Sequence, residues 1–467
     1  MRKLLYTLLA ISIFSNPCSA QKPSFKQSVI ASNLQDPWSI AIDGEGYLWV
    51  TESKSYKILC VNPSDGAIVL SADLSMLREF PRYDTLKLKD KPWPQGGLMG
   101  LVLHPNFDTT DPYLFVAYVY KHVEGNRFLT RLSRFRFDKE QAILTDETIL
   151  DNDVPGSNDH NGGRLAIHAN RGFRYLYYAV GDMGAGQYSN GGRANSAQDA
   201  TSKEGKILRF LADPDTAAVD QWIPSDNPFN TESRSAVYSV GHRNPQGLAC
   251  GQSEGFSLLF SCEHGPMSDD EVNIIEKGKN YGHPLIVGYA DGNYNGLSAA
   301  VSDDQTLPGP WHSALPVIAD EQDQAYAFGD TYRNPIYSFA ASDAGYLKKR
   351  FARVRESKDA EWESIAPSSL AFYNHQAIPD WKNSLLVTAL KTGLVYRLTL
   401  SADGRAVIGD PEELFSNKVR YRDICLSPDG KKIYLITDRS AITSGPTEEN
   451  PKEVNLRGCI VAFKLVE

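Results

Sequence analysis

The sequence predicts an all-β protein, a six-bladed β-propeller with long inter-blade loops. One pattern recurs six times along the chain: small or apolar residues, a polar turn with Gly or Asp, and apolar strands. Few convincing helical stretches separate the copies, and each copy is too small to bury both of its faces alone. Six such units arranged radially would cover one another, whereas two packed sandwiches would fit the strand content but not the six-fold recurrence.

The six copies give the order of the predicted blades. They span residues 38–50, 97–118, 163–180, 247–261, 368–387 and 422–436. Their uneven spacing indicates long loops. The longest interruption, residues 265–367, exceeds ordinary connections and is typical of a functional loop. Since no linker composition separates the copies, we expect a single propeller domain over residues 21–467.

Residues 1–20 have the pattern of a secretory signal peptide. Arg2 and Lys3 give a positive start, residues 4–14 are apolar but too short to span a bilayer, and Ala20 ends a run of small residues. We therefore expect cleavage after Ala20 and a periplasmic or secreted mature protein without a membrane span.

Charge and cysteine content exclude several functions. Lys and Arg number 48 against 57 Asp and Glu, for a net charge of −9, so no broad basic surface is available for nucleic acid. One of the six cysteines lies in the leader, so the mature chain carries an odd number in an oxidising compartment. Cys250 and Cys262 flank a predicted hairpin and are the candidate pair for a disulfide. The cysteine spacing fits neither covalent haem nor zinc.

A histidine with acidic neighbours is the first candidate for catalysis. Residues 157–164 read Ser-Asn-Asp-His-Asn-Gly-Gly-Arg and place Asp159 and His160 directly before a predicted strand. An imidazole works as a general base near neutral pH when an acid such as Asp159 or Asp182 fixes its tautomer. The segment by itself equally allows a turn in which His160 hydrogen-bonds the backbone.

Basic and amide side chains beside several strands form a second candidate group. Residues 241–248 read Gly-His-Arg-Asn-Pro-Gln-Gly-Leu, and Lys391, Arg420 and Arg422 lie just before or after other strands. A guanidinium group binds a carboxylate through two hydrogen bonds, so several such cationic side chains that converge would make a pocket for a small polyanion. Solvated surface charge is the alternative for each of them alone.

An acidic run in the longest interruption is a candidate metal site. Residues 265–271 read Gly-Pro-Met-Ser-Asp-Asp-Glu, and Tyr281, Tyr289 and Asp291 follow. Adjacent carboxylates repel one another unless a hard cation neutralises them, and calcium is suited to an exported protein. A helix N-terminus over residues 269–271, where acidic side chains are favoured, is the alternative.

The ordered set of these segments resembles the soluble pyrroloquinoline-quinone (PQQ)-dependent glucose dehydrogenase and aldose sugar dehydrogenase family, whose fold is a six-bladed propeller. The resemblance extends from about Asn33 to the C-terminus, and its most specific pieces are residues 241–248, 265–271 and 420–423. It implies an enzyme that oxidises the anomeric carbon of an aldose to the lactone by hydride transfer to PQQ and passes the electrons to an external acceptor. Members of this family often form homodimers.

The resemblance assigns roles to residues by their place in these motifs. His160 corresponds to the catalytic base that takes the anomeric proton, Asp182 to its acidic partner, and Arg243 to a residue that steadies negative charge beside the quinone. Cofactor contacts are implied for Gln187, Asn244, Lys391, Arg420 and Arg422. Substrate contacts are implied for Gln95, Asp159 and Trp362.

The resemblance also implies two calcium sites. Gly265 and Pro266 correspond to backbone ligands of a calcium ion joined to the cofactor, where the metal acts as a Lewis acid. A second, structural calcium would take side-chain or backbone oxygens of Glu271, Tyr281, Val287, Tyr289 and Asp291, with Glu321 as a further candidate ligand.

The chain departs from the family pattern at the substrate rim. Trp362 corresponds to one member of an aromatic pair around the sugar, but Asp359 replaces the tyrosine three residues earlier. His264 replaces the glutamine before Gly265, and the family's small disulfide in this region is absent. The preferred sugar is therefore left open within the aldoses.

Two other classes of function are compatible with a propeller. A calcium-dependent lactonase would also place carboxylates near a central metal, but it would not need Lys391, Arg420 and Arg422. A non-catalytic sugar- or protein-binding propeller would need neither His160 nor Arg243. The presence of base, cations and Gly-Pro corner together favours the dehydrogenase.

Overall fold

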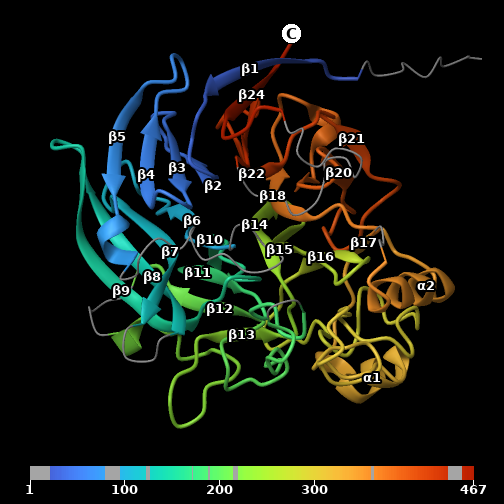
Figure 1. Cartoon of the computed structure of the whole chain (residues 1–467). Helices are drawn as coiled ribbons and strands as arrows, with labels where there is room; N and C mark the ends of the chain where they lie inside the picture. Colours follow the sequence, from blue (N-terminus) through green and yellow to red (C-terminus); the bar gives the residue numbers. More distant parts are fainter. Residues whose placement is uncertain are drawn as a thin grey trace, which may run out of the picture.

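Six four-stranded antiparallel sheets surround a common axis in the part of the chain that the computed structural model describes (Figure 1). The described residues are 22–78, 95–122, 127–170, 172–187, 190–213, 219–358, 362–439 and 455–466. The predicted six-bladed β-propeller is confirmed. The predicted signal peptide lies outside the described residues.

The chain builds the blades one after another and closes the ring with its first strand. From the axis outwards, the first blade consists of β2(Pro37–Ile42), β3(Leu48–Glu52), β4(Lys57–Val61) and β5(Ile68–Asp73), and the second of β6(Leu98–Leu103), β7(Tyr113–His122), β8(Arg127–Asp138) and β9(Ile143–Pro155). The third consists of β10(Leu165–Asn170), β11(Phe173–Val180), β12(Lys206–Leu211) and β13(Val237–Val240), and the fourth of β14(Pro245–Ser253), β15(Phe256–Glu263), β16(Asp270–Ile274) and β17(Tyr337–Phe339). The fifth consists of β18(Pro367–Tyr373), β19(Ser384–Ala389), β20(Val395–Thr399) and β21(Glu412–Leu414). The sixth consists of β22(Tyr421–Leu426), β23(Lys432–Thr437), β24(Ile460–Leu465) and β1(Phe25–Ala31). Because β1 pairs antiparallel with β24, hydrogen bonds between the two ends of the described chain close the ring.

Each predicted repeat coincides with the inner hairpin of one blade; residues 38–50, for example, span β2 and β3. Apolar side chains of these hairpins pack against the next blade. Trp49 of β3 lies edge-on to Phe107 and Phe137 of the second blade, with ring centroids 5.3 and 4.9 Å apart. Such large rings bury much of their surface only when a neighbouring blade covers them, which explains why one unit cannot stand alone.

A buried ion pair joins the inner strands at the axis. The Arg164 guanidinium, just before β10, binds the Asp423 carboxylate of β22, and both side chains are at most 5% exposed. Arg164 also donates to the backbone oxygens of Gln246 in β14 (2.9 Å) and Ser368 in β18 (3.2 Å). The hydroxyl of Ser39 in β2 donates to Asp423 (3.1 Å). One ion pair therefore connects five of the six blades.

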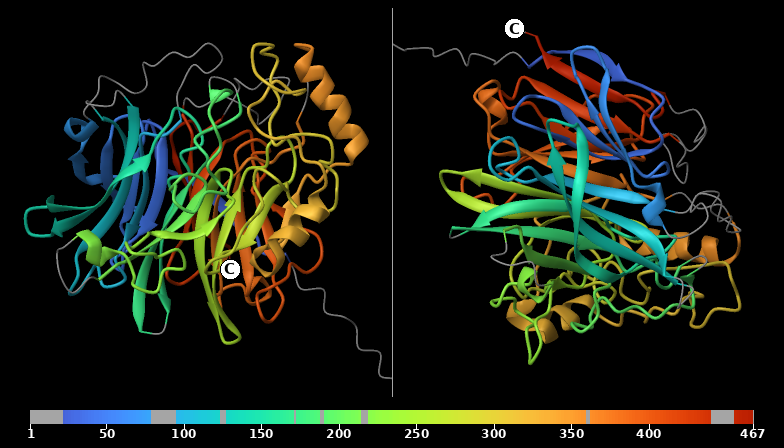
Figure 2. Two further views of the ribbon diagram at one scale, coloured as in Figure 1. Left: turned by 90° about the horizontal axis from the view of Figure 1, so that it is seen from below. Right: turned by 90° about the vertical axis from the view of Figure 1, so that its left-hand side faces the viewer.

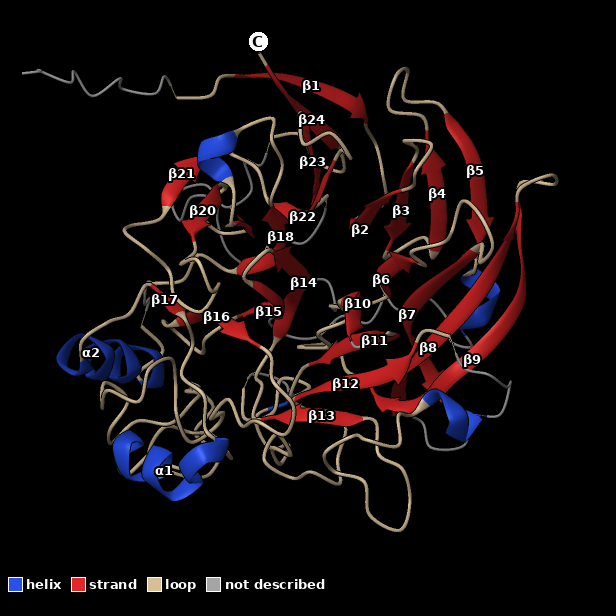
Figure 3. Cartoon of the chain, turned by 180° about the vertical axis from the view of Figure 1, so that it is seen from behind, coloured by secondary structure: helices blue, strands red, loops and turns tan. Residues whose placement is uncertain are grey.

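Residues 265–367, predicted to be one long interruption, contain regular structure. They include β16 and β17, the outer strands of the fourth blade, and the helices α1(Glu321–Phe328) and α2(Ala344–Arg355). Both helices lie outside β16 and β17 rather than over the axis (Figure 3), and α2 stands at the edge of the ring in the side view (Figure 2, left). None of the helices in the described ranges has the length and apolarity needed to cross a membrane.

The candidate disulfide does not form. Cys250 and Cys262 are both free thiols. In the β14–β15 hairpin, Cys250 lies opposite Leu259, and Cys262 lies opposite Gly247. The two cysteines are therefore three positions out of register, or about 10 Å along the strands. Disulfide geometry needs facing Cβ atoms about 4 Å apart, which this pairing cannot provide.

Candidate active site

The predicted catalytic and cofactor residues lie in connections at one end of the propeller. Because neighbouring strands of a blade are antiparallel, the connection entering the inner strand and the one between the second and third strands emerge at the same end. His160 lies between β9 and β10, Asp182 between β11 and β12, and Arg243 between β13 and β14. Lys391 follows β19, and Arg422 is at the start of β22. The topology therefore collects residues from four different blades and the connections between them.

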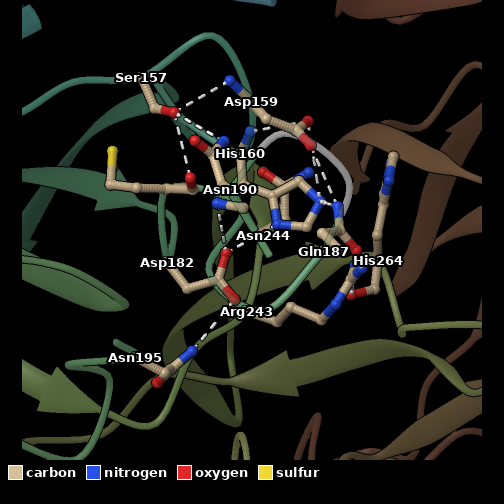
Figure 4. Close-up of polar contacts among 12 residues, drawn as sticks. Ser157, Asp159, His160, Asp182, Gln187, Asn190, Asn195, Arg243, Asn244 and His264 are labelled. Atoms are coloured by element: carbon tan, nitrogen blue, oxygen red, sulfur yellow. Dashed lines mark hydrogen bonds and ion pairs between the residues drawn. The ribbon is translucent and has the colours of Figure 1, made fainter. Parts of the chain in front are cut away.

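His160 is held on both sides of its ring (Figure 4). Its Nδ1 atom lies 2.7 Å from Oδ1 of Asp182, and its Nε2 atom lies 2.8 Å from the amide nitrogen of Gln187. The amide oxygen of Gln187 accepts from Nη2 of Arg243 (2.8 Å), which fixes the orientation of the amide. A carboxylate accepts and an amide N–H donates, so Nδ1 carries the proton and Nε2 keeps its lone pair. This is the tautomer that a general base requires.

Asp182 is a fully engaged carboxylate that is only 1% exposed. Its Oδ1 accepts from His160 and from the Gly184 N–H (3.0 Å). Its Oδ2 lies 2.9 Å from Nε2 of His283 and 3.3 Å from the amide nitrogen of Asn195. Burial raises the pKa of Asp182, but the charge and hydrogen bonds of the two histidines outweigh it and hold that pKa well below its ordinary value. No sequence motif marked His283 or Asn195.

The backbone at this corner is strained. His160 and Met183 both have positive φ, 47° and 62°, which is costly for residues with a Cβ atom. The carbonyl oxygen of His160 lies against Gly181, where an added Cβ atom would stand only 2.0 Å from it. The glycine before Asp182 is therefore required by close packing. A simple turn, the alternative for His160, does not account for a ring bound by both Asp182 and an amide.

The predicted substrate residues Gln95 and Asp159 border the imidazole. The amide oxygen of Gln95 accepts from the backbone N–H of His160 (3.4 Å), and Asp159 Oδ2 accepts from the amide nitrogen of Gln187 (3.1 Å). Asp159 Oδ1 lies 3.9 Å from Nε2 of His160. Polar groups therefore surround the atom that would accept a proton.

Trp362 and Lys391 meet at the connection that leads into β18. The Lys391 ammonium donates to the backbone oxygen of Trp362. The Trp362 ring packs edge-on to Phe351 of α2, with ring centroids 6.3 Å apart. A predicted cofactor cation and a predicted sugar-contacting residue are thus neighbours. The departure at Asp359 lies outside the described residues.

Arg420 is buried and the Arg422 side chain is only 12% exposed, so solvated surface charge is the wrong interpretation for them. Arg420 binds Asp438 through Nε (3.2 Å), and Arg422 binds it through Nε and Nη2 (2.8 Å each). Nη1 of Arg422 donates to the amide oxygen of Gln246 (3.3 Å). The amide nitrogen of Gln246 in turn donates to the amide oxygen of Asn244 (2.8 Å). The carboxylate of Asp36 also acts on both guanidinium groups, and that of Asp423 acts on Arg422. This network also connects β22 to the predicted cofactor residue Asn244.

His264 reports the charge of this region. Burial and then the nearby positive groups, Arg243 first, lower the pKa of His264 to about 3. Arg422 adds to the same effect. The Nε2 atom of His264 is buried and has no hydrogen-bond partner among the described residues. A neutral imidazole with an unsatisfied atom beside arginines fits a region that binds an anionic ligand.

Asp270 holds the predicted Gly-Pro metal corner, residues 265–266. Its Oδ1 accepts from the N–H of Gly265 (3.0 Å), and its Oδ2 accepts from the N–H of Ile365 (2.8 Å). The Gly265 carbonyl accepts from Nη1 of Arg243 (2.9 Å). One buried carboxylate therefore ties the corner to the connection before β18.

The acidic residues predicted for the structural calcium gather around one loop. Glu271 accepts from the N–H of Gly288 (3.0 Å), and Glu321 accepts from the N–H of Val287 (2.9 Å). Burial raises the pKa of Glu321 to about 7, with a smaller contribution from Asp291. Burial also raises the pKa of Glu271 well above its ordinary value. Glu271 belongs to β16, so the helix N-terminus proposed as the alternative is wrong.

The oxygen donors of this loop are chemically suited to a hard cation, although the carboxylates here bind N–H groups. Among the described residues, no three His, Cys, Asp or Glu side chains converge as a metal site. A calcium ion would therefore depend on backbone oxygens, for which Tyr281, Val287 and Tyr289 are the predicted sources. The Tyr289 oxygen accepts from the N–H of Asp291 (2.8 Å).

Comparison with known proteins identifies the family. The glucose/sorbosone dehydrogenase family model matches residues 34–327 and 349–443. The chain belongs to the glucose/sorbosone dehydrogenase family. This confirms the resemblance inferred from the motifs, and membership in this family makes the chain a sugar dehydrogenase of the oxidoreductase class.

Two relatives and one solved structure illustrate the range of similarity to this member of the family. Quinoprotein glucose dehydrogenase B of Acinetobacter calcoaceticus is 30% identical over 444 residues, which cover 90% of this chain and 86% of that protein. Aldose sugar dehydrogenase YliI of Escherichia coli K12 is 26% identical, over 94% of this chain and 97% of that protein. The PQQ-bound aldose sugar dehydrogenase of Streptomyces coelicolor shares the fold, with a TM-score of 0.61 at 20% identity over 95% of this chain and 100% of that chain.

Proposed function

We propose that this member of the glucose/sorbosone dehydrogenase family is an exported, PQQ-dependent aldose dehydrogenase. It oxidises the anomeric carbon of a glucose-like sugar to the lactone and passes the electrons to an external acceptor. The observation that carries the proposal is the orientation of His160, whose Nδ1–H is held by Asp182 while Nε2 keeps its lone pair. Removal of a hydroxyl proton requires such a lone pair beside the substrate.

The residues around His160 have distinct tasks in this reaction. The anomeric hydroxyl takes the place of the Gln187 amide as the donor to Nε2. Asp182 stabilises the resulting imidazolium, since it is ionised and 2.7 Å from Nδ1. Gln95 and Asp159 orient the sugar through its other hydroxyl groups. Trp362 would cover an apolar face of the ring.

The cationic groups support PQQ as the cofactor. Lys391, Arg420 and Arg422 would hold its carboxylates, with Arg243 and Asn244 beside its ring oxygens. Burial lowers the pKa of His264 most, and Arg243 and Arg422 lower it further, so a polyanion bound beside these arginines would meet favourable charge. When bound, PQQ would supply the hydride acceptor that amino-acid side chains lack.

We also propose two calcium ions, one at residues 265–266 beside the cofactor and one at the loop that Glu271 and Glu321 hold. The chemistry of the oxygen donors supports both positions. Export rests on the leader pattern of residues 1–20.

A titration of purified apoprotein with PQQ tests this function. The protein is equilibrated with calcium, the cofactor is added stepwise, and a panel of aldoses is then added with an artificial electron acceptor. We expect saturable binding followed by sugar-dependent bleaching. Binding without reduction by any sugar would reject aldose oxidation. Absence of binding would reject the dehydrogenase and leave the lactonase and the sugar-binding propeller to be tested.

A further inference from the structure

A second histidine contacts the carboxylate that orients the proposed base. His283 is 5% exposed and places its Nε2 atom 2.9 Å from Oδ2 of Asp182. His160 occupies the other oxygen of the same carboxylate, at 2.7 Å. The three side chains come from connections up to 123 positions apart in the sequence, so packing between blades, and no local motif, brings them into one row.

The geometry determines which nitrogen of His283 carries a proton. Asp182 is ionised, and a bare ring nitrogen 2.9 Å from a carboxylate oxygen would be repelled. Nε2 of His283 therefore bears hydrogen and donates. The amide oxygen of Asn195 accepts from the N–H of Ala197 (2.9 Å), so its nitrogen lies 3.0 Å from Nε2 of His283 and 3.3 Å from Oδ2 of Asp182. Two donors meet at this oxygen, because the charged carboxylate and not the neutral amide sets the proton on Nε2.

We propose that His283 is a positioning residue for the sugar oxidation, and that it holds Oδ2 of Asp182 so that Oδ1 stays aimed at Nδ1 of His160. This inference rests on the proposed function. Its consequence is chemical as well as geometric. A donor on Oδ2 draws charge away from Oδ1, so the imidazolium form of His160 is stabilised less than it would be by a carboxylate with a free second oxygen.

Other titratable groups face these rings and stay in place when His283 is replaced. Besides Asp182, His160 faces Asp159 and His264. His283 also faces Arg243 and Glu263. A change in the titration of His160 after substitution of His283 alone therefore reports the contact with Asp182.

Histidine-ring NMR of the wild-type apoprotein provides the first test. Selective ring labelling gives the tautomer of His283 between pH 6 and 8, and we expect the proton on Nε2. A bare Nε2 would overturn the proposal, because this nitrogen could not then donate to Asp182. The measurement needs neither activity nor a variant that folds.

Substitution provides the second test. His283→Phe keeps the ring size and removes the donor, whereas His283→Gln keeps an N–H that can reach the carboxylate. We expect the pKa of His160, followed by NMR in the apoprotein, to rise by about half a unit or more in the Phe variant and to return near the wild-type value in the Gln variant. His168→Gln, in a buried histidine bound to Ser257, is the matched control and should leave His160 unchanged.

The acid limb of the pH profile of kcat/KM should move upwards with the NMR value. A lower melting temperature with an unchanged pKa of His160 would show a merely structural role and overturn the proposal. If the wild-type holoenzyme oxidises no sugar, the proposed function fails, while the NMR titration still decides whether His283 acts on His160 through Asp182.

Discussion

Replacement of Asp182 by Asn tests the proposed site most directly. The carboxylate accepts hydrogen bonds from four groups: His160, Gly184, His283 and Asn195. The amide has nearly the same shape but accepts through only one of its two atoms. Its nitrogen would therefore face a donor in either orientation. If it faces His160, the ring proton moves from Nδ1 to Nε2 and removes the lone pair that the reaction needs.

The magnitude follows from this change of tautomer. We expect kcat/KM to fall by about 10³- to 10⁴-fold, or about 4–5.5 kcal/mol of transition-state stabilisation. PQQ affinity should stay unchanged, since Asp182 does not belong to the cation cluster. If the amide turns the other way, a buried donor loses its acceptor, which costs about 1–3 kcal/mol of folding free energy.

Steady-state kinetics with a saturating cofactor, PQQ titration and urea unfolding measure these quantities. Asp151→Asn is the matched control because Asp151 is a buried carboxylate of β9 that binds Lys203 outside the site (2.7 Å). It should lower stability and leave kcat/KM within about threefold. An Asp182→Asn enzyme that keeps kcat/KM within tenfold of wild type would refute the role of this carboxylate.

The pH dependence of stability supplies an independent check. The folded-state pKa of Asp182 lies below its ordinary value of 3.8. The unfolded chain therefore binds this proton first as the pH falls, and the stability that the carboxylate contributes is present above about pH 4 and lost below it. The Asn variant should lack this loss, so the two unfolding free energies should converge as the pH falls below 4.

His160→Ala should lower turnover by about 10²- to 10⁴-fold with PQQ affinity intact, and unchanged turnover would reject its assignment as the base. Lys391→Ala and Arg422→Ala should each weaken PQQ binding by about tenfold in a titration; wild-type affinity in both would reject the cationic pocket. Chelation by EGTA should lower both activity and melting temperature, with recovery on adding calcium, and indifference to the chelator would argue against both calcium sites. Arg164→Leu or Asp423→Leu should each cost about 3–5 kcal/mol in urea unfolding, because each leaves a buried charge unpaired. The double variant should cost less than the sum of the two, and strict additivity would contradict the coupling.

The propeller was predictable because its signal is local and repeated. Each inner hairpin needs the same alternation of turn and apolar strand, and burial between blades imposes that pattern six times. The outer strands carry less of it. β1(Phe25–Ala31) is largely exposed and has no apolar periodicity, and β17(Tyr337–Phe339) has only three residues. For the same reason, residues 265–367 were predicted to be a single interruption although they contain two strands of a blade.

The acidic run at residues 269–271 shows where local preference is overruled. Its composition is typical of a loop or a helix start, yet Asp270 and Glu271 begin a fully buried strand. The Asp270 carboxylate is satisfied by backbone N–H groups near residue 365, and that of Glu271 by Gly288 and Asn273. Burial of two carboxyl groups in a strand depends in part on partners distant in sequence, such as Gly288 and Ile365, which no local pattern can supply.

The sequence by itself determined the fold and the family and supplied the candidate site residues, since the motifs around His160 and Arg243 stand in a fixed order along the repeats. Only the tertiary structure decided how these residues are supported. His283 meets Asp182 across 101 positions, and Asp438 meets Arg420 and Arg422 across the open end of the β22–β23 hairpin. The direction of a hydrogen bond onto a carboxylate is set by the packing of whole blades, and residue order does not contain that geometry.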